Sequence, residues 1–492
     1  MTQNMTEPNH ASRQLSRRDL LRTAAVATTA AVILPATRAM AEPYPSKRPA
    51  PAQRKFRSKA VDAAIASVSA KIADPELAWL FANCLPNTLD TTVEPGTYQG
   101  KPDTVVVTGD INAMWLRDSS AQVYPYLPFL SSDTELATLI QGVIHRQARC
   151  ILIDSYANAF MANLDSPEPL DWSRTDTTKM TKGVGERKWE VDSLCYTVRL
   201  AHRYWKETRD TTPFDDTWHH AQSRILATFR EQQRKNGPGP YSFQRTSAIP
   251  TDSLPGSGFG NPTRPIGLIH AGFRPSDDAC IYPFNIPGNF FAVQTLHRME
   301  EMLTEIAHDT ASAREAASLR AEIEAVLKQY APAQHPVAGR IYAYEIDGFG
   351  NNLFMDDANV PSLLALPYLG ACSPSDPLYL ATRKFVLGPN NPYFFKGTAA
   401  EGIGGPHIGQ DMIWPMAIIM RALTTEDEKE QLTCLHQLKT THANTGFMHE
   451  SFNKDNPAKF TREWFAWANT LFGELILTID KKSPKLLTMR NI

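Results

Sequence analysis

One short segment of the chain concentrates side chains that can exchange protons and bind polar ligands. It begins at His270 with the sequence His-Ala-Gly-Phe-Arg-Pro-Ser-Asp-Asp-Ala and continues through Asn289. Two adjacent carboxylates, Asp277 and Asp278, stand beside an arginine, and proline and glycine interrupt any regular periodicity. We therefore predict a shaped loop that leads into a helix near Pro287. Its acids can take part in binding or catalysis, or they can cap the turn and the next helix.

Two further segments carry side chains suited to sugar binding. Trp115 is followed by Arg117 and Asp118, so a flat aromatic face stands beside a charge pair. Aromatic rings bind the apolar C–H face of a sugar and fork-like charged groups bind adjacent hydroxyls, although the same pair can cap a helix. Glu190 and Asp192 open a predicted helix, where acids either stabilise the N-terminal dipole or contact a sugar hydroxyl.

Two other segments, one acidic and one rich in glycine, also carry side chains that can bind a ligand. Asp356 and Asp357 precede a proline and an apolar helix, and they can bind calcium or sugar hydroxyls. The alternate spacing of acids in a calcium loop is absent, which disfavours a metal site. The loop from Gly402 to Gly409 lacks the lysine and Ser/Thr of a phosphate-binding loop. We expect its glycines to bring the backbone close to a ligand while His407 projects into the site.

A further candidate carboxylate, Glu450, lies in the C-terminal part of the chain. Glu450 stands between His449 and Ser451, with Phe447 and Phe452 on either side. Aromatic flanks and burial raise the pKa of a carboxyl group, and a nearby histidine lowers it. Such a tunable group is suited to work as a catalytic acid or base.

Helical periodicity dominates the chain that must position these residues. We predict helices at 59–85, 133–155, 190–209, 217–235, 287–309 and 311–330, and weaker ones at 359–369, 378–387, 408–422, 427–440 and 461–480. Short strand-like pieces occur at 104–108 and 340–346. The polar loops recur about every second helix, at 109–119, 170–192, 251–289, 347–361, 396–414 and 442–456. Helices that run up and down around a ring bring such loops to one end, so we predict a single all-α domain, an (α/α)6 toroid with a few short strands.

Composition excludes several functional classes. The 492 residues are 42% hydrophobic and 21% charged with a net charge of -2, which is typical of a soluble enzyme and does not favour binding to nucleic acid or an acidic membrane. The six cysteines form no C-x-x-C or Cys/His cluster, so a zinc site is not expected. Several lie in apolar periodic segments, which favours buried free thiols. We expect no metal and no other cofactor.

The first 41 residues have the features of an export signal. Ser16-Arg17-Arg18-Asp19-Leu20-Leu21 is a twin-arginine pattern, an apolar run covers 24–34, and Ala39-Met40-Ala41 is an A-x-A cleavage site. The run is about 11 residues, too short for a membrane-spanning helix of roughly 20. Removing five arginines and two acids takes the net charge from -2 to about -5. We expect a bacterial protein exported after folding to the periplasm or medium, a poorly ordered linker at 42–56, and a catalytic domain at 57–492.

Six segments together resemble glycoside hydrolase family 125, the bacterial exo-α-mannosidases. They are, in chain order, Trp115-Leu-Arg-Asp-Ser, Gly272-Phe-Arg-Pro-Ser-Asp-Asp, Asn285-Ile-Pro-Gly-Asn, Met355-Asp-Asp-Ala-Asn-Val-Pro-Ser, Gly404-Gly-Pro-His and Met448-His-Glu-Ser-Phe. The resemblance runs from about residue 57 to the C-terminus. It implies an (α/α)6 toroid that removes non-reducing terminal α-1,6-linked mannose from a glycan with inversion and without a metal.

Catalytic roles follow from the same resemblance. The implied general acid falls in Arg274-Pro-Ser-Asp-Asp278, where we place it at Asp277 with Asp278 as its rival, and the implied general base is Glu450. An inverting hydrolase uses one protonated carboxyl group and one carboxylate that holds water on the opposite face of the sugar, roughly 6.5–9.5 Å apart. The residues expected to bind substrate are Trp115, Arg117, Asp118, His270, Arg274, Asn289, Asp356, Asp357, His407 and His449.

Other functions remain open at this point. Another toroidal glycosidase, acting on an α-glucoside such as trehalose or maltose, would use the same pair of carboxyl groups. A non-catalytic glycan-binding protein would be expected to have lost one of them, and Asp277, Asp278 and Glu450 are all present. A polysaccharide lyase would favour a cationic groove, which the acidic charge of the mature chain disfavours.

Overall fold

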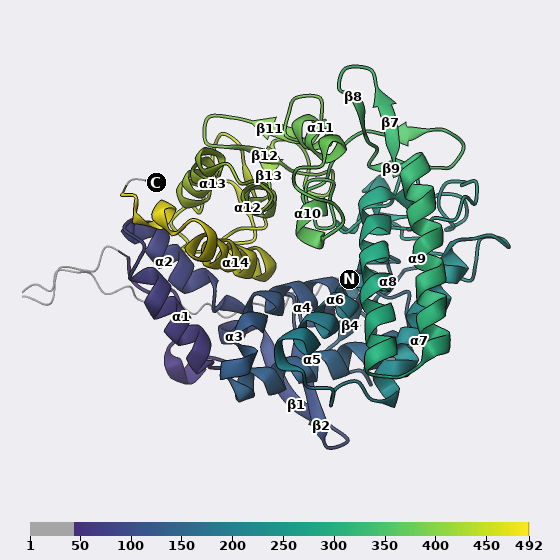
Figure 1. Ribbon diagram of the computed structural model, residues 1–492, viewed down its shortest axis with the longest axis horizontal. Helices are drawn as coiled ribbons and strands as arrows, with labels where there is room; N and C mark the ends of the chain where they lie inside the picture. The colour runs from purple at the N-terminus through teal and green to yellow at the C-terminus, as the bar shows by residue number, and fades with distance from the viewer. Residues whose placement is uncertain (1–43, 491) are drawn as a thin grey trace, which may run out of the picture. The chain divides into compact units, whose positions relative to one another are not determined.

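The helices of the chain alternate between an inner and an outer ring. A computed structural model describes residues 44–490 and residue 492, and Figure 1 shows the helices arranged around a common centre. The inner helices are α4 (Leu116–Val123), α6 (Val191–Thr208), α8 (Ile286–Glu305), α10 (Leu366–Leu369), α12 (Pro415–Leu423) and α14 (Ala466–Lys482). The outer helices are α1 (Lys59–Ser69), α2 (Pro75–Cys84), α5 (Thr134–Ile153), α7 (Asp216–Gln232), α9 (Thr310–Tyr330), α11 (Pro377–Val386) and α13 (Glu428–Thr440). This arrangement confirms the predicted helical toroid.

The C-terminal helix closes the ring. Helix α14 packs against α12 on one side and α4 on the other, and it also contacts α2 from the start of the domain. A Cβ on Gly473 of α14 would lie 2.6 Å from Leu85 Cδ1, so only glycine lets the two ends of the chain approach this closely. Helices far apart in sequence therefore share one core.

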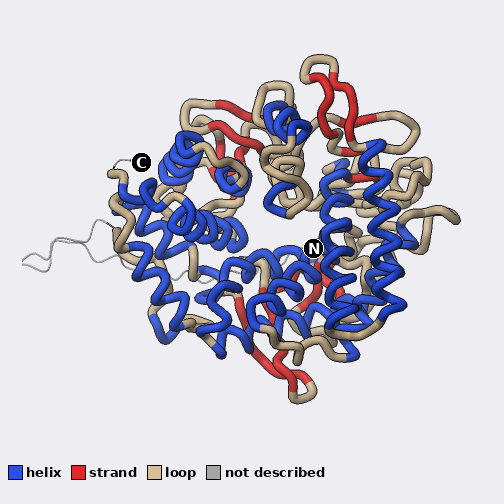
Figure 2. The backbone as a smooth tube through the Cα atoms, viewed as in Figure 1, coloured by secondary structure: helices blue, strands red, loops and turns tan. Residues whose placement is uncertain are grey.

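Short antiparallel strands fill the connections between helices (Figure 2). Two-stranded sheets pair β1 (Val93–Tyr98) with β2 (Lys101–Val106), β7 (Pro332–His335) with β8 (Gly339–Tyr342), and β11 (Phe394–Lys396) with β12 (Glu401–Ile403). Three-stranded sheets, in spatial order, are β3 (Ala113–Trp115), β4 (Ala159–Met161) and β5 (Val184–Glu186); β6 (Phe284–Asn285), β9 (Glu345–Ile346) and β10 (Asn352–Leu353); and β13 (Met412–Ile413), β14 (Ser451–Asn453) and β15 (Phe460–Thr461). Strands β3, β6 and β13 run almost directly into inner helices.

The two rings begin their helices in different ways. Six outer helices start at an aspartate whose carboxylate accepts a backbone N–H of the first turn, namely Asp74, Asp133, Asp215, Asp309, Asp376 and Asp427. Five inner helices, α4, α6, α10, α12 and α14, start without such a cap, at Trp115, Glu190, Ala365, Trp414 and Phe465. Their first N–H groups and positive dipole ends remain available to negative charge at that end of the ring.

Several predicted boundaries are wrong for local reasons. The helix predicted at 59–85 is two helices, because Asp74 caps a new one that starts at Pro75. The segment predicted as a helix at 359–369 is helical only from Leu366. A short helix at α3 (Asn87–Thr91) and the inner helix α4 were not predicted. All eight residues of α4 are buried although five are polar, and the helix is too short to show a repeated apolar period.

Residues 44–56, predicted as a poorly ordered linker, instead contact the helical domain. The Trp79 indole N–H donates to the carbonyl of Pro45 at 2.8 Å. The Arg48 guanidinium bonds to Asp90 at 2.7 Å and to Asp62 at 2.9 Å. The two half-buried contacts of Arg48 and the exposed one of Pro45 hold the segment against the domain. The predicted export signal at 1–41 lies outside the described residues.

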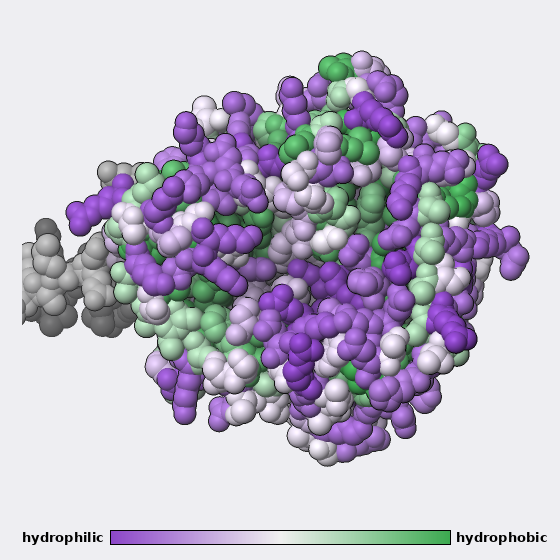
Figure 3. Space-filling model, in the orientation of Figure 1, coloured by the Kyte–Doolittle hydropathy of each residue, from purple (hydrophilic) through white to green (hydrophobic). Residues whose placement is uncertain are grey.

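Two other predictions concern the whole domain. All six cysteines lie in the described part of the chain and are free thiols, five of them buried, as their apolar surroundings predict. Among the helices described, none is long and apolar enough to cross a membrane. Polar residues cover most of the face seen in Figure 3, and apolar residues form only scattered patches there.

Candidate active site

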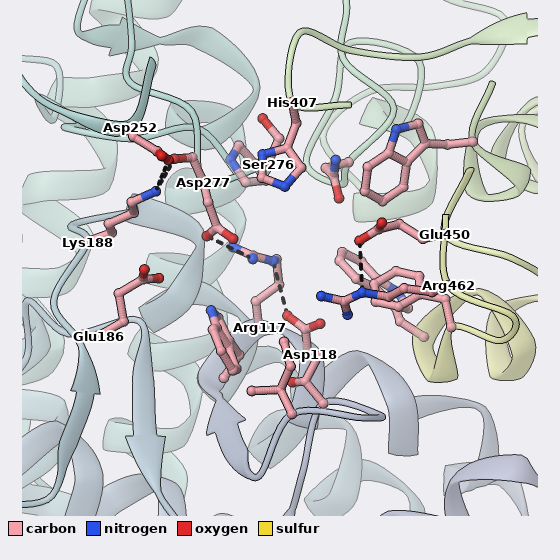
Figure 4. Close-up of a pocket in the computed structure, with 18 of the residues that line it drawn as sticks. Arg117, Asp118, Glu186, Lys188, Asp252, Ser276, Asp277, His407, Glu450 and Arg462 are labelled. Carbon is pink, nitrogen blue, oxygen red and sulfur yellow. Dashed lines mark hydrogen bonds and ion pairs between the residues drawn. The ribbon is translucent and has the colours of Figure 1, made fainter. Parts of the chain in front are cut away.

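A pocket of about 280 Å³ lies at the end of the ring where the inner helices begin. Its lining includes Thr108, Ile111, Trp115, Arg117, Asp118, Trp172, Glu186, Lys188, Arg245, Asp252, Pro275, Ser276, Asp277, Asn359, His407, Trp414, Glu450, Arg462, Phe465 and Trp467. All six of the loops predicted to meet at one end contribute to this lining, and residues outside those loops complete it, namely Thr108, Arg245, Arg462, Phe465 and Trp467. Asp277 and Glu450 lie on opposite sides of the pocket, with Arg117 between them (Figure 4).

A strained turn sends Asp277 into the pocket. Its φ is +67°, in the left-handed region that non-glycine residues rarely adopt. The turn is closed by the Arg274 amide, which donates to Asp278 at 2.8 Å, and by the Asp277 amide, which donates to Arg274 at 3.0 Å. An isolated bridge between Phe273 and Ala279 holds its base. Asp277 and its neighbour therefore point in different directions.

The rival aspartate lies behind the pocket wall. The Asp278 residue is 2% exposed, and its carboxylate contacts the Ser276 hydroxyl at 3.4 Å and His407 Nδ1 at 3.7 Å. It is absent from the pocket lining, whereas the Asp277 side chain is 24% exposed. Of the two aspartates, Asp277 is the one that can reach a ligand.

Cations and an amide surround the Asp277 carboxylate. Arg117 Nη2 lies 3.5 Å from Asp277 Oδ1, and the Asn158 amide donates to the same oxygen at 3.3 Å. Lys188 Nζ donates to the Asp277 backbone carbonyl at 2.8 Å. Burial raises the pKa of Asp277, but a hydrogen bond with Glu190 and the charges of Arg117 and Lys188 outweigh it and lower that pKa below its ordinary value.

Arg117 is shared by several carboxyl groups beneath the pocket. Its Nη1 donates to Glu190 Oε2 at 2.6 Å and lies 3.5 Å from Asp192 Oδ2, and its Nε lies 3.4 Å from Asp118 Oδ2. These acids belong to the first turns of α4 and α6, whose dipoles favour negative charge. Burial nevertheless raises the pKa of Asp192 to about 6, and it also raises the pKa of Asp118.

Glu450 occupies the opposite wall. It immediately precedes β14, which pairs with β13 and β15, so the sheet fixes its backbone. Arg462 Nε lies 3.5 Å from Glu450 Oε1, and the Glu450 side chain is 12% exposed. Trp414, Phe465 and Trp467 line the pocket on this side, at or next to the uncapped starts of α12 and α14. The wall combines one carboxylate with aromatic faces.

His407 projects into the pocket from the glycine-rich loop, as predicted. Burial lowers its pKa, but the Asp278 carboxylate at 3.7 Å and the charges of Asp277 and Glu450 outweigh burial and raise the pKa of His407 to about 9. Gly405 beside it approaches Asp357 so closely that a Cβ would lie 3.2 Å from the carboxylate. His407 is therefore a cation at neutral pH that lies between the two carboxylate walls (Figure 4).

A polar wall beyond Asp277 was not predicted. Glu186, Lys188 and Asp252 lie on the side of Asp277 away from Glu450 (Figure 4), and Lys188 Nζ donates to Asp252 at 3.3 Å. The Trp172 indole N–H donates to Glu186 at 3.1 Å, while 45% of the Trp172 residue is exposed. Arg245 Nη2 donates to Glu186 at 2.9 Å. These residues are single polar side chains in long loops, and no motif in the sequence marks them as part of a site.

Three of the predicted substrate contacts on the 270–289 segment are instead structural. His270 is fully buried with neither ring nitrogen bonded within the described residues, and burial lowers its pKa well below the ordinary value. Arg274 Nε donates to Glu345 at 2.5 Å beneath the turn that carries Asp277. Asn289 bonds to both backbone groups of Ile269. None of the three lines the pocket.

Three further predicted contacts also lie outside the pocket lining. Asp356 accepts the amides of Leu363 and Leu364 at 2.8 and 2.9 Å, and burial raises its pKa to about 8. Asp357 accepts the Ser276 hydroxyl at 2.8 Å. His449 stacks on Phe460 with ring centroids 3.9 Å apart. Their polar atoms hold loops in place. The candidates that the structure does bring together in the pocket are Trp115, Arg117, Asp118, Asp277, His407 and Glu450.

Comparisons with known proteins agree over most of the chain. The sequence profile of the metal-independent alpha-mannosidase family (GH125) matches residues 74–477. The meiotically up-regulated gene 157 protein of Schizosaccharomyces pombe is 42% identical over 458 residues, which is 90% of each chain. A solved Streptococcus pneumoniae metal-independent α-mannosidase, in a non-productive complex with α-1,6-mannobiose, is 41% identical with a TM-score of 0.83. That comparison covers 87% of this chain and 100% of the pneumococcal one.

Proposed function

Because this chain belongs to the metal-independent α-mannosidase family, glycoside hydrolase family 125, we propose that it is an exo-acting, inverting hydrolase that releases terminal α-1,6-linked mannose from glycans. The observation that carries the proposal is the pair Asp277 and Glu450, which face each other across one pocket (Figure 4). The α-1,6 linkage is supported by the disaccharide bound to the pneumococcal relative.

Asp277 is proposed as the general acid and Glu450 as the general base. In its protonated form Asp277 gives a proton to the glycosidic oxygen as the bond to the anomeric carbon breaks. Glu450 takes a proton from the attacking water on the opposite face, so the α-linked sugar leaves as the β-anomer. Arg462, whose Nε lies 3.5 Å from Glu450 Oε1, orients the carboxylate for this role.

The pocket walls support the exo mode. The buried acids around Arg117 lie behind one part of the pocket lining, and we propose that they close the pocket to the middle of a glycan chain while a chain end can enter. Trp115 and the aromatic side chains near Glu450 offer flat faces to the terminal sugar. The leaving group then lies on the Asp277 side, against Trp172 and Lys188.

A linkage panel tests this proposal. Hydrolysis of α-1,2-, α-1,3- and α-1,6-mannobiose is measured side by side with maltose and trehalose. We expect α-1,6-mannobiose to have the highest kcat/KM. Preference for another mannobiose would refute the linkage, preference for maltose or trehalose would refute the sugar, and binding without hydrolysis would indicate a lectin-like protein.

We also propose that the chain is a bacterial protein exported through the twin-arginine pathway to the periplasm or medium, with cleavage after Ala41. The ordered twin-arginine pair, apolar run and A-x-A site support this. Replacing Arg17 and Arg18 by lysine should leave precursor in the cytoplasm, as detected by fractionation and N-terminal sequencing. Normal export of that double variant would refute the pathway.

A further inference from the structure

Resting on the proposed function, we propose that Glu190 is the proton partner of Asp277. The two carboxyl groups share one proton, and Glu190 returns it to Asp277 for transfer to the leaving oxygen. Glu190 is not one of the residues that line the pocket, so it is a positioning residue that acts through Asp277.

One guanidinium links the two carboxyl groups. Arg117 Nη1 donates to Glu190 Oε2 at 2.6 Å, and its Nη2 lies 3.5 Å from Asp277 Oδ1. Glu190 is fully buried at the start of α6, whereas Asp277 is open to the pocket. The pair thus has one member that is shielded from water and one that can reach a ligand.

The local charge count requires a bound proton. Arg117 lies within 3.5 Å of four carboxyl groups, those of Asp118, Glu190, Asp192 and Asp277. The nearby cation Lys188 bonds to the Asp277 backbone carbonyl rather than to one of these carboxylates. Several ionised acids cannot share one buried guanidinium without a large desolvation cost, so at least one of them holds a proton.

The hydrogen bonds of Glu190 indicate where that proton lies. Both Arg117 and Ser193 donate to Glu190 Oε2, at 2.6 and 2.8 Å. Glu190 Oε1 is buried and has no donor among the described residues. Two ionised carboxylates cannot hydrogen-bond to each other, whereas a proton on Oε1 gives Glu190 a donor for Asp277, whose carboxylate contacts the same guanidinium.

The surrounding charges agree with this placement. Burial and Asp277 raise the pKa of Glu190 well above its ordinary value although Arg117 opposes them, while the pKa of Asp277 is lowered. Other charged and titratable groups also face the pair. They are Arg117 and Asp118 on α4, Asp192 on α6, Lys188 before α6, His407 after β12, and Glu186. The Asn158 amide donates to both Glu186 and Asp277.

Proton sharing resolves a difficulty of the acid role. A lone Asp277 beside Arg117 and Lys188 would be ionised at neutral pH and could not protonate a leaving group. In a pair that holds one proton, repulsion between the two carboxylates keeps the last proton bound to higher pH. The shared proton moves from Glu190 to Asp277, and Asp277 then gives that same proton to the glycosidic oxygen. The pair is then doubly ionised and regains one proton from solvent, while Glu450 releases the proton taken from water.

The experiment compares Glu190→Gln with the wild-type enzyme on α-1,6-mannobiose and on nitrophenyl α-mannoside. The amide keeps the shape of the side chain but holds no transferable proton. We expect kcat on mannobiose to fall by about tenfold or more, with a much smaller loss on the nitrophenyl substrate, whose leaving group needs little protonation. The alkaline limb of kcat/KM for mannobiose should move to lower pH by about one unit or more, because Asp277 then titrates alone beside Arg117.

Asp192→Asn is the matched control, since Asp192 also contacts Arg117 Nη1 but lies 3.5 Å away. It should not produce this dependence on the leaving group. Glu190→Asp, which keeps an acid but withdraws it by one methylene, serves as the second variant if Glu190→Gln fails to fold. Infrared difference spectra provide a readout without turnover: the wild type should show a protonated carboxyl band at neutral pH that Glu190→Gln lacks.

Two failures are distinguishable. A wild-type enzyme that cleaves α-1,6-mannobiose while Glu190→Gln retains the same leaving-group dependence, pH profile and carboxyl band would overturn the role of Glu190 alone. A folded wild-type enzyme with no activity on any mannoside would refute the proposed function and this inference with it.

Discussion

Asp277 and Asp278 are consecutive residues whose carboxyl groups lie in different surroundings. Asp277 has a φ of +67° and opens into the pocket, while Asp278 is 2% exposed and contacts Ser276 and His407 behind the wall. The left-handed turn thus directs two identical side chains differently. Asp277 can reach a substrate, and Asp278 contacts the lining residues Ser276 and His407 from behind.

This separation predicts different kinetics for the two variants. Asp277→Asn should lower kcat on α-1,6-mannobiose by about 10²–10⁴-fold and have less effect on nitrophenyl α-mannoside. Asp278→Asn should affect both substrates alike, because it alters the position of His407 rather than the protonation of the leaving group. The ratio of the two rates, measured for each variant, would identify Asp278 as the acid if only Asp278→Asn showed the leaving-group dependence.

Stability should fall at alkaline pH through His407. The pKa of His407 is raised from 6.5 to about 9 in the folded protein, chiefly by Asp278 acting against burial. Its stabilising contribution is therefore fully present below about pH 6.5 and is lost as pH rises through about 9. Denaturant unfolding between pH 6 and 10 should show a decline that is smaller in His407→Gln. An equal decline in the free energy of unfolding for the wild type and for His407→Gln would contradict a stabilising ion pair between His407 and Asp278.

Trp172 should contribute to binding of the leaving group. Its ring is 45% exposed at the pocket wall, so Trp172→Ala should fold normally. We expect KM for α-1,6-mannobiose to rise by about fivefold, equivalent to ~1 kcal/mol of aromatic contact, with little change for methyl α-mannoside. Tyr98→Ala is the control, because Tyr98 is similarly exposed but lies on the distant β1–β2 hairpin. An equal change in KM for Trp172→Ala and Tyr98→Ala would exclude a contact between Trp172 and the leaving group.

Arg274 should matter for stability rather than for substrate contact. Its buried guanidinium bonds to Glu345, which also accepts the amides of Ile281 and Tyr282. Arg274→Met leaves Glu345 buried without its cation, which should cost about 3–5 kcal/mol in the free energy of unfolding. Urea denaturation measures this loss. A variant of normal stability with an impaired KM would restore Arg274 as a substrate ligand.

The sequence predicts the ring better than it predicts the pocket. Outer helices such as α5 and α9 are amphipathic and capped by aspartate, so periodicity and caps mark them. The inner helix α4 has only eight residues, all buried and five of them polar, so it shows no repeated apolar period of the kind that marks a long helix. Helix α4 was therefore missed although Arg117 and Asp118 were identified from their residue types.

Similar limits apply to individual side chains. Asp356 and Asn289 have the residue types of sugar ligands, yet their polar atoms are bonded to backbone groups. The opposite holds for Lys188 and Arg462, which lie in the pocket without a motif to mark them. The direction in which a polar side chain points depends on contacts between segments far apart in sequence. Those contacts form only when the helices close into a ring.

The first-formed anomer of mannose tests the central claim most directly. Proton NMR of α-1,6-mannobiose hydrolysis, recorded before mutarotation, distinguishes α- from β-mannose. Asp277 and Glu450 acting from opposite sides of the pocket as acid and base predict β-mannose first. Mannose that appears first as the α-anomer would contradict this account, because a carboxylate would then have attacked the sugar itself in a two-step retaining reaction.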